Sequence, residues 1–367
     1  MKKRVLVLGC TGSIGSQTLD IIRNEKDLFE VAGLSVGQNK NALESLCSEF
    51  NCSGTCWASD GQEGLERLLD ECKADIAVNG VAGSQGLLSS VAVLEHGINL
   101  ALANKESVVM AWPLIKELAF KNRCSIVPVD SEHSAIFSLV SHFGSRRTSQ
   151  IIITASGGPF RNYSREQLES VTVEDALKHP TWNMGKKITI DSASLANKGL
   201  EVIEACRLFD VETKDVKVLV HPQSIVHSII RTNDGMLYAQ MSDPDMRHPI
   251  YSALVWPENR TNYLEPFNLA GHELSFFEPR LDDFPMLTLA YQCADKGGSY
   301  TIAFNAANEI AVDAFINKKI GFTDIPKIVE ATLNCDWKKE PWTVEEVLEA
   351  DRLSHEKARI ILDGRNF

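Results

Sequence analysis

The stretch VLVLGCTGSIGSQTLDIIRN, residues 5–24, decides the fold of the N-terminal part of the chain. A short apolar run is followed by glycines at positions 9, 12 and 15 and then by apolar residues at helical spacing. A strand that enters a helix through such a turn lets the backbone approach a pyrophosphate, and the free N–H groups of the helix bind it. Thr11 replaces the second glycine of the usual G-x-G-x-x-G pattern, so a purely structural turn is the alternative interpretation.

Further apolar runs predict strands at 29–36, 74–80, 99–103 and 124–129, with helical segments between them. Alternating strands and helices are typical of a doubly wound parallel sheet. We therefore expect an α/β, Rossmann-like nucleotide-binding domain over residues 1–130.

The end of the second predicted strand indicates which nucleotide is used. An NAD-specific site usually has Asp or Glu there to hold the ribose 2'-hydroxyl. This chain has Gln38 and Asn39 followed by Lys40, with no carboxylate to repel a 2'-phosphate. NADPH is therefore the expected cofactor.

The rest of the chain predicts two more domains and a connection. Alternating side chains at 150–160, 216–231 and 236–241 predict an open antiparallel sheet in a central α+β catalytic domain, residues 131–256. Residues 257–285 have little periodicity and are expected to be a linker. Residues 286–367 predict a small helical bundle domain, with helices at 286–296, 301–317, 324–334 and 343–362, the last with Thr343 as its N-cap and Glu346 three residues later.

Composition excludes several classes of protein. Of 367 residues, 44% are apolar and 23% are charged, as in soluble globular proteins, and the net charge of -12 disfavours nucleic acid as a partner. No run approaches the ~20 apolar residues that cross a bilayer, so no membrane association is expected. Nine scattered cysteines without a disulfide framework favour a reducing, cytoplasmic location. Cys52 and Cys56 have zinc-like spacing but lack a second ligand pair.

Two groups of acids predict a metal site. In VDSEH, residues 129–133, an extended backbone would point Asp130 and Glu132 to the same side. In the helix expected over DSASLANKGLEVIEACRLF, residues 191–209, Asn197, Lys198 and Glu201 share one face. Three carboxylates without thiolate or imidazole partners suit Mg²⁺ or Mn²⁺. The alternative is a Lys198–Glu201 surface pair and an Asp130 that is satisfied at a turn.

A phosphate pocket is predicted at TASGGPF, residues 154–160, where two glycines can expose N–H groups beside the Ser156 hydroxyl. Ser192, Asn197 and Lys198 would add donors, and Asp191 and Ser192 are expected to cap a helix. HPTWNMGKK, residues 179–187, is expected to form a lid loop at about 178–188 with Trp182 over the ligand. A plain turn and a tryptophan packed on the core are the alternatives.

These stretches, with ALANKES, HPQSIVHS and FNAANEIAV, resemble the 1-deoxy-D-xylulose 5-phosphate reductoisomerase family over residues 9–313. The resemblance implies NADPH, one divalent cation (Mg²⁺ or Mn²⁺), a sugar phosphate substrate and a homodimer. The implied metal ligands are Asp130, Glu132 and Glu201. The implied catalytic residues are Lys105, Glu132, His179 and Trp182. The implied substrate contacts are Lys105, Ser131, Glu132, Ser156, His179, Ser192, Asn197, Lys198 and Glu201. The implied cofactor contacts are Thr11, Gly12, Ser13, Ile14, Gly37, Gln38, Asn39, Asn104, Glu106 and Gly185.

The resemblance also implies a reaction, in which retro-aldol cleavage and re-aldolisation precede hydride reduction to 2-C-methyl-D-erythritol 4-phosphate. Family members commonly have lysine where this chain has Gln38, which bears on the preference for NADP over NAD. Two other functions use the same residues. A metal-assisted NADP dehydrogenase would make no branched product, and a nucleotide-sensing module would not oxidise NADPH.

Overall fold

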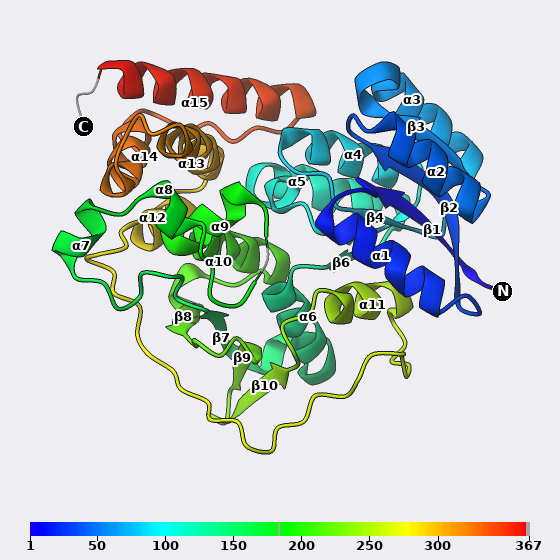
Figure 1. The fold of residues 1–367 in the computed structure, drawn as a ribbon, viewed down its shortest axis with the longest axis horizontal. Coiled ribbons are helices and arrows are strands. Elements are labelled where there is room, and N and C mark those ends of the chain that lie inside the picture. Colours follow the sequence, from blue (N-terminus) through cyan, green and yellow to red (C-terminus); the bar gives the residue numbers. More distant parts are fainter. Residues whose placement is uncertain (183, 365–367) are drawn as a thin grey trace. The chain divides into compact units, whose positions relative to one another are not determined.

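The structure is a computed structural model that describes residues 1–182 and 184–364, so Asn183 of the expected lid lies outside the described residues. The chain divides into two compact units (Figure 1). The first unit comprises Met1–Phe137 and Asp245–Phe267, and the second comprises Ser138–Pro244 and Asn268–Phe367. The domain boundaries expected from the sequence stay a prediction.

The first unit is built on a parallel sheet. Its strands are β1 (Lys3–Leu8), β2 (Phe29–Val36), β3 (Ser53–Cys56), β4 (Ile76–Asn79), β5 (Asn99–Leu102) and β6 (Ile126–Pro128). The order β3-β2-β1-β4-β5-β6, with every pair parallel, confirms the Rossmann-like fold. The strand order reverses between β1 and β4, and ligands of such sheets bind beyond the carboxyl ends of the strands at this point.

Helices of the first unit complete its core. They are α1 (Ser13–Asn24), α2 (Lys40–Phe50), α3 (Trp57–Cys72), α4 (Ser84–Glu95), α5 (Lys105–Asn122) and α11 (Arg247–Val255); α6 (Ser131–Phe143) begins in this unit and ends in the second. Ile250 and Leu254 of α11 are fully buried in the same apolar cluster as Val5 and Val7 of β1. This packing explains why the segment 245–267 returns to the first unit.

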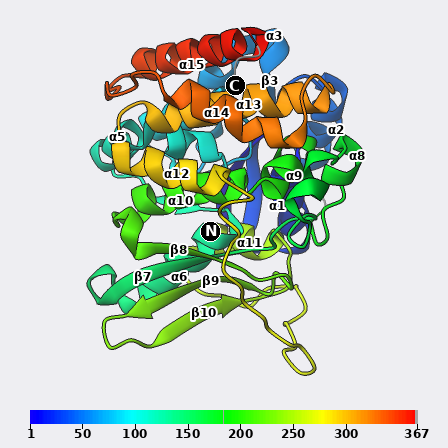
Figure 2. The same ribbon diagram turned by 90° about the vertical axis from the view of Figure 1, so that its left-hand side faces the viewer.

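The second unit contains a mixed sheet, which the second view displays (Figure 2). Its strands are β7 (Thr148–Ala155), β8 (Val216–Val220), β9 (Val226–Thr232) and β10 (Leu237–Met241), in the order β10-β9-β7-β8. The expectation of a wholly antiparallel sheet was wrong, because β7 and β8 pair in parallel. The long helical connection between these two strands provides the crossover that parallel pairing needs.

Helices make up most of the remaining regular structure of the second unit. They are α7 (Arg165–Glu169), α8 (Val173–Ala176), α9 (Lys186–Ala193), α10 (Ala196–Phe209), α12 (Met286–Lys296), α13 (Tyr300–Ile316), α14 (Ile325–Leu333) and α15 (Val344–Gly364), with short 3₁₀ helices at Ser145–Arg147, Thr213–Asp215 and Phe322–Asp324. The four C-terminal helices confirm the expected helical region. Its last N-cap is also present, because the Glu346 N–H donates to Thr343 Oγ1 at 3.2 Å. Helix α10 contacts both the sheet and α12.

Among the described residues, no helix combines the length and the apolar character needed to cross a membrane.

The turn between β1 and α1 depends on glycine. Gly9 has a φ of +75°, a left-handed conformation that favours glycine. A Cβ on Gly15 would lie 2.3 Å from the Gly9 carbonyl oxygen and 2.5 Å from the Cys10 Cα. Both are backbone atoms, so a side chain at position 15 would force α1 away from the strand.

We expect Gly15→Ala to lower the free energy of unfolding by about 1–3 kcal/mol, as overpacking in a core does, and to weaken NADPH binding. Gly37→Ala is the matched control for stability, because no described atom lies within 4 Å of a Cβ there. Urea unfolding and NADPH fluorescence titration measure the two effects. Equal stability of the two variants would contradict the close approach of α1 to the strand end.

Candidate active site

The first unit gathers most of the residues expected to bind the cofactor. Helix α1 begins at Ser13, and its N-cap Gly12 has no side chain to occupy the first N–H groups. The N–H groups of Gly9 and Cys10 donate to the Ser35 carbonyl of β2 at 3.0 and 2.9 Å, which fixes the turn. Thr11, Gly12, Ser13 and Ile14 therefore lie at the carboxyl end of β1, where a helix N-terminus can bind an anion.

Two other strand ends carry the remaining cofactor residues of this unit. Gly37, Gln38 and Asn39 follow β2, and Asn39 accepts the Ala42 N–H at 3.1 Å as the N-cap of α2. Asn104 caps α5, and its amide donates to Glu106 at 2.7 Å while Glu106 accepts the Gly83 N–H at 3.2 Å. Gly185 belongs to the second unit, where it is the N-cap of α9.

Asp130 is the N-cap of α6, and this position corrects the extended geometry expected for VDSEH. Its Oδ1 accepts the N–H groups of Glu132 and His133 at 3.1 and 3.3 Å. The carboxylates of Asp130 and Glu132 nevertheless converge, with one oxygen of each within 4.8 Å. A carboxylate that caps the helix faces its first turn, and Glu132 lies in that turn.

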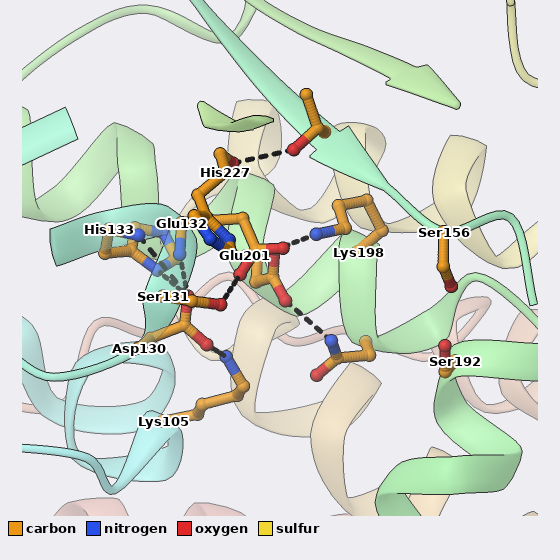
Figure 3. Close-up of polar contacts among 12 residues, drawn as sticks. Lys105, Asp130, Ser131, Glu132, His133, Ser156, Ser192, Lys198, Glu201 and His227 are labelled. Carbon is orange, nitrogen blue, oxygen red and sulfur yellow. Dashed lines mark hydrogen bonds and ion pairs between the residues drawn. The ribbon is translucent and has the colours of Figure 1, made fainter. Parts of the chain in front are cut away.

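Two hydrogen-bonding partners keep Asp130 ionised. Figure 3 shows the Lys105 ammonium pointing at one oxygen of Asp130, and the imidazole of buried His133 hydrogen-bonds the other at 3.0 Å. Burial alone would raise the pKa of Asp130, but the charge of Lys105 and the His133 hydrogen bond bring it well below its ordinary value. Ser131 donates its hydroxyl hydrogen bond to Glu132.

The expected helical face is confirmed in α10 of the second unit. The Asn197 amide donates to Glu201 Oε1 at 2.6 Å, and Lys198 forms an ion pair with the other oxygen (Figure 3). Glu201 and Lys198 are only 1% and 5% exposed, so the surface-pair alternative is wrong. A buried ion pair is tolerated because each charge offsets the desolvation of the other.

A second cluster in this unit joins three residues expected to contact substrate. His179 Nε2 lies 3.1 Å from the hydroxyl oxygens of both Ser156 and Ser192. The other ring nitrogen, Nδ1, accepts the N–H groups of Thr181 and Trp182 at 3.1 and 2.9 Å. Because Nδ1 is an acceptor, the ring proton sits on Nε2 and points to the hydroxyls. Burial lowers the pKa of His179 to about 4, so the ring is neutral near pH 7.

The helix expected to start at Asp191 and Ser192 is displaced. Both residues lie inside α9, and α10 starts at Ala196 after Leu195, whose φ is +62°. Asp191 is a buried carboxylate that pairs with Lys187 and Asn308, so its side chain does not cap a helix. Ser192 still faces His179.

Trp182 is half-buried, with its ring centroid 6.5 Å from that of His227. His227 is buried on β9 and its Nε2 hydrogen-bonds the Ser242 hydroxyl at 2.9 Å. Sequence reasoning did not assign a role to His133 or His227. An N-cap interpretation of Asp130 would have identified His133, because a residue three positions after an N-cap lies beside it.

Comparisons with known proteins identify the family. Family models described as 1-deoxy-D-xylulose 5-phosphate reductoisomerase match residues 5–60 and 53–112, and models of its C-terminal domains match residues 126–209 and 241–357. The protein of that name from Treponema denticola is 50% identical over 94% of this chain and 93% of its own length. The one from Treponema pallidum is 46% identical over 99% of this chain and 98% of its own length.

Solved structures agree over the whole chain. A reductoisomerase from Zymomonas mobilis in complex with NADPH matches with a TM-score of 0.90 and 37% identity, and 99% of each chain is covered. A DOX-P reductoisomerase in complex with NADPH, fosmidomycin and magnesium matches with a TM-score of 0.89 and 35% identity, and 98% of each chain is covered. This chain therefore belongs to the 1-deoxy-D-xylulose 5-phosphate reductoisomerase family.

Proposed function

We propose that this protein converts 1-deoxy-D-xylulose 5-phosphate into 2-C-methyl-D-erythritol 4-phosphate, with NADPH as reductant and one divalent cation. The observation that carries the proposal is 50% identity over nearly the full length to a reductoisomerase. The protein is thus an NADPH-dependent oxidoreductase that also isomerises a sugar phosphate. When bound, the cation stabilises negative charge on substrate oxygens and NADPH supplies the hydride.

Asp130, Glu132 and Glu201 are the proposed ligands of the cation. The donor set fits Mg²⁺ or Mn²⁺, because it offers only carboxylate oxygens and two of them already converge at the start of α6. The lysine partners of Asp130 and Glu201 give further support. Each lysine neutralises a carboxylate in the absence of another cation, and each can turn to a substrate oxygen when the cation takes over that carboxylate.

Ser156, His179 and Ser192 are proposed to bind the substrate phosphate, together with Asn197 and Lys198. The Nε2–H of neutral His179 and the two hydroxyls offer three donors that converge, a pattern that suits phosphate oxygens. The Ser156 hydroxyl also accepts the Gly158 N–H at 3.2 Å, which orients it. A firmly held phosphate keeps both fragments of a cleaved carbon chain in place.

Lys105, Ser131 and Glu132 are proposed to contact the reacting part of the substrate. The Lys105 ammonium holds a proton that it can share with a substrate hydroxyl, which makes it a candidate general acid. Trp182 is proposed to cover the substrate and exclude water. The nicotinamide nucleotide is assigned to the Gly9–Gly15 turn, Gly37 to Asn39, Asn104, Glu106 and Gly185.

We further propose a homodimer in the cytoplasm. The family resemblance supports the dimer, and the nine cysteines support the location, because all of them are described and free. Light scattering at several protein concentrations tests the dimer.

The decisive experiment follows NADPH absorbance with 1-deoxy-D-xylulose 5-phosphate, with and without Mg²⁺, and identifies the product. We expect oxidation only with the metal, and a branched polyol phosphate. An unbranched product would favour a plain dehydrogenase instead. No oxidation of NADPH under any of these conditions would refute the proposed reaction.

We expect Glu201→Gln to weaken Mn²⁺ binding at least about tenfold, because the amide loses a charged ligand oxygen, and to leave NADPH affinity nearly unchanged. Glu204→Gln is the matched control, since Glu204 is buried on the same helix and is not among the proposed ligands. Titration of Mn²⁺ by electron paramagnetic resonance measures binding without turnover. Equal Mn²⁺ affinity of wild type and Glu201→Gln would show that Glu201 is no ligand.

We expect Gln38→Lys to raise kcat/KM for NADPH relative to NADH about fivefold, because a lysine there adds roughly 1 kcal/mol of attraction to the 2'-phosphate. Gln38 is exposed, so the change should leave the fold intact. Gln38→Glu should shift the ratio in the opposite direction. If neither variant moves the ratio, the 2'-phosphate binds elsewhere.

His179 should make the unfolding free energy depend on pH. Its pKa is about 4 in the fold and about 6.5 in the unfolded chain, so the unfolded chain takes up the proton first and stability falls as pH drops from 6.5 to 4. We expect His179→Gln to lose less stability than wild type over this window. Urea titrations at pH 4.5, 5.5 and 6.5 measure it, and parallel curves for the two proteins would disprove the neutral, half-buried imidazole.

A further inference from the structure

Asp191 is a buried charge that the proposed chemistry does not use. It is 2% exposed and lies in α9, one residue before Ser192, which is proposed to bind the substrate phosphate with Ser156 and His179. Its Oδ1 accepts the Asn308 amide of α13 at 2.7 Å, and its Oδ2 accepts the Lys187 ammonium at 2.9 Å. Burial of a carboxylate costs several kcal/mol unless its oxygens are satisfied, and here both are.

Asn308 makes this bond at the expense of its own carbonyl. It is fully buried, and its Oδ1 has no hydrogen-bond partner among the described residues. The amide cannot turn over, because its oxygen would then face the Asp191 carboxylate. A buried acceptor without a donor costs about 1–3 kcal/mol. An apolar side chain at position 308 would avoid that cost. The amide is therefore explained by its hydrogen bond to Asp191 and not by packing.

The next residue of α13 adds an electrostatic attraction to α9. Glu309 follows Asn308 and interacts electrostatically with Lys187. Glu309 is itself held by the His355 imidazole of α15 at 3.0 Å and by Asn305 at 3.2 Å. Asn308 therefore provides a directional contact from α13 to α9, in addition to this attraction between Glu309 and Lys187.

The hydrogen bond from Asn308 to Asp191 fixes how α9 is rotated about its own axis. Successive residues of an α-helix point about 100° apart, so when Asp191 is held toward α13, Ser192 is held toward His179, where its hydroxyl lies 3.1 Å from Nε2. A small rotation or shift of α9 would move the Ser192 hydroxyl out of the cluster. Loss of a phosphate contact that is made equally in the ground state and the transition state raises KM and leaves kcat unchanged.

We propose that Asn308 is a positioning residue, which holds Asp191 so that α9 presents Ser192 to the substrate phosphate. The inference rests on the proposed function, because the phosphate belongs to that substrate. It assigns the C-terminal helices a part in substrate binding, although Asn308 itself contacts no substrate.

The first test compares two alanine variants on one helix. Asn308→Ala should raise the KM for 1-deoxy-D-xylulose 5-phosphate about tenfold, with kcat and the Kd for NADPH nearly unchanged. Asn305→Ala is the matched control, because Asn305 is 2% exposed on the same helix and bonds to Glu309 instead of Asp191. Thermal unfolding of both variants is recorded. An unchanged KM in Asn308→Ala, or an equal rise in Asn305→Ala, would overturn the proposal.

The second test exchanges the two partners and does not depend on Asn308→Ala being folded. Asn308→Asp places two carboxylates face to face and should raise KM further. Adding Asp191→Asn restores one amide and one carboxylate, and should bring KM back toward the wild-type value. A double variant no better than Asn308→Asp would refute a role for this hydrogen bond. Absence of wild-type turnover would instead refute the proposed function.

Discussion

The burial of carboxylates beside lysines is the constraint on which the candidate active site depends. Glu201 and Lys198 are almost completely buried together on α10, and Asp130 meets Lys105 at the start of α6. An isolated buried charge costs several kcal/mol, whereas a paired one is tolerated and stays ionised. Each pair thus keeps an anionic oxygen and an ammonium group ready inside the protein. Within its own unit, Asp130 is fixed as the N-cap of α6, and in the other unit α10 contacts both β7 and α12.

Local signals in the sequence predicted a large part of this arrangement. The Gly9–Gly15 turn before α1 depends only on residues that are close in the sequence. The shared face of Asn197 and Glu201 follows from helical periodicity alone. The same holds for Thr343, whose capping of α15 depends only on the residues that follow it. These interactions are between residues close in sequence, so no knowledge of the tertiary structure was needed.

The features that sequence reasoning missed depend on distant partners or on a choice between two local structures. An aspartate at position 130 is compatible with an extended strand end and with a helix N-cap. Helix α6 begins directly after it, so Asp130 is the N-cap. The sequence around Asp191 is typical of a helix cap. In the structure its side chain instead accepts the amide of Asn308, which lies more than a hundred residues later. Likewise, nothing within β8 indicates that it pairs in parallel with β7, and nothing within α11 indicates that its apolar face completes the core of the first unit.

The proposed phosphate site, Ser156, His179 and Ser192, differs in electrostatics from the two carboxylate–lysine pairs. Its imidazole is kept neutral by burial and by two backbone N–H groups at Nδ1, so His179 offers a directed donor without adding a charge. A cationic histidine in this half-buried position would have to be desolvated, which costs free energy. A neutral ring avoids that cost while retaining the Nε2–H. If these residues bind the phosphate as proposed, recognition depends on where the hydroxyls and the ring lie, and the proposed role of α13 follows from that dependence.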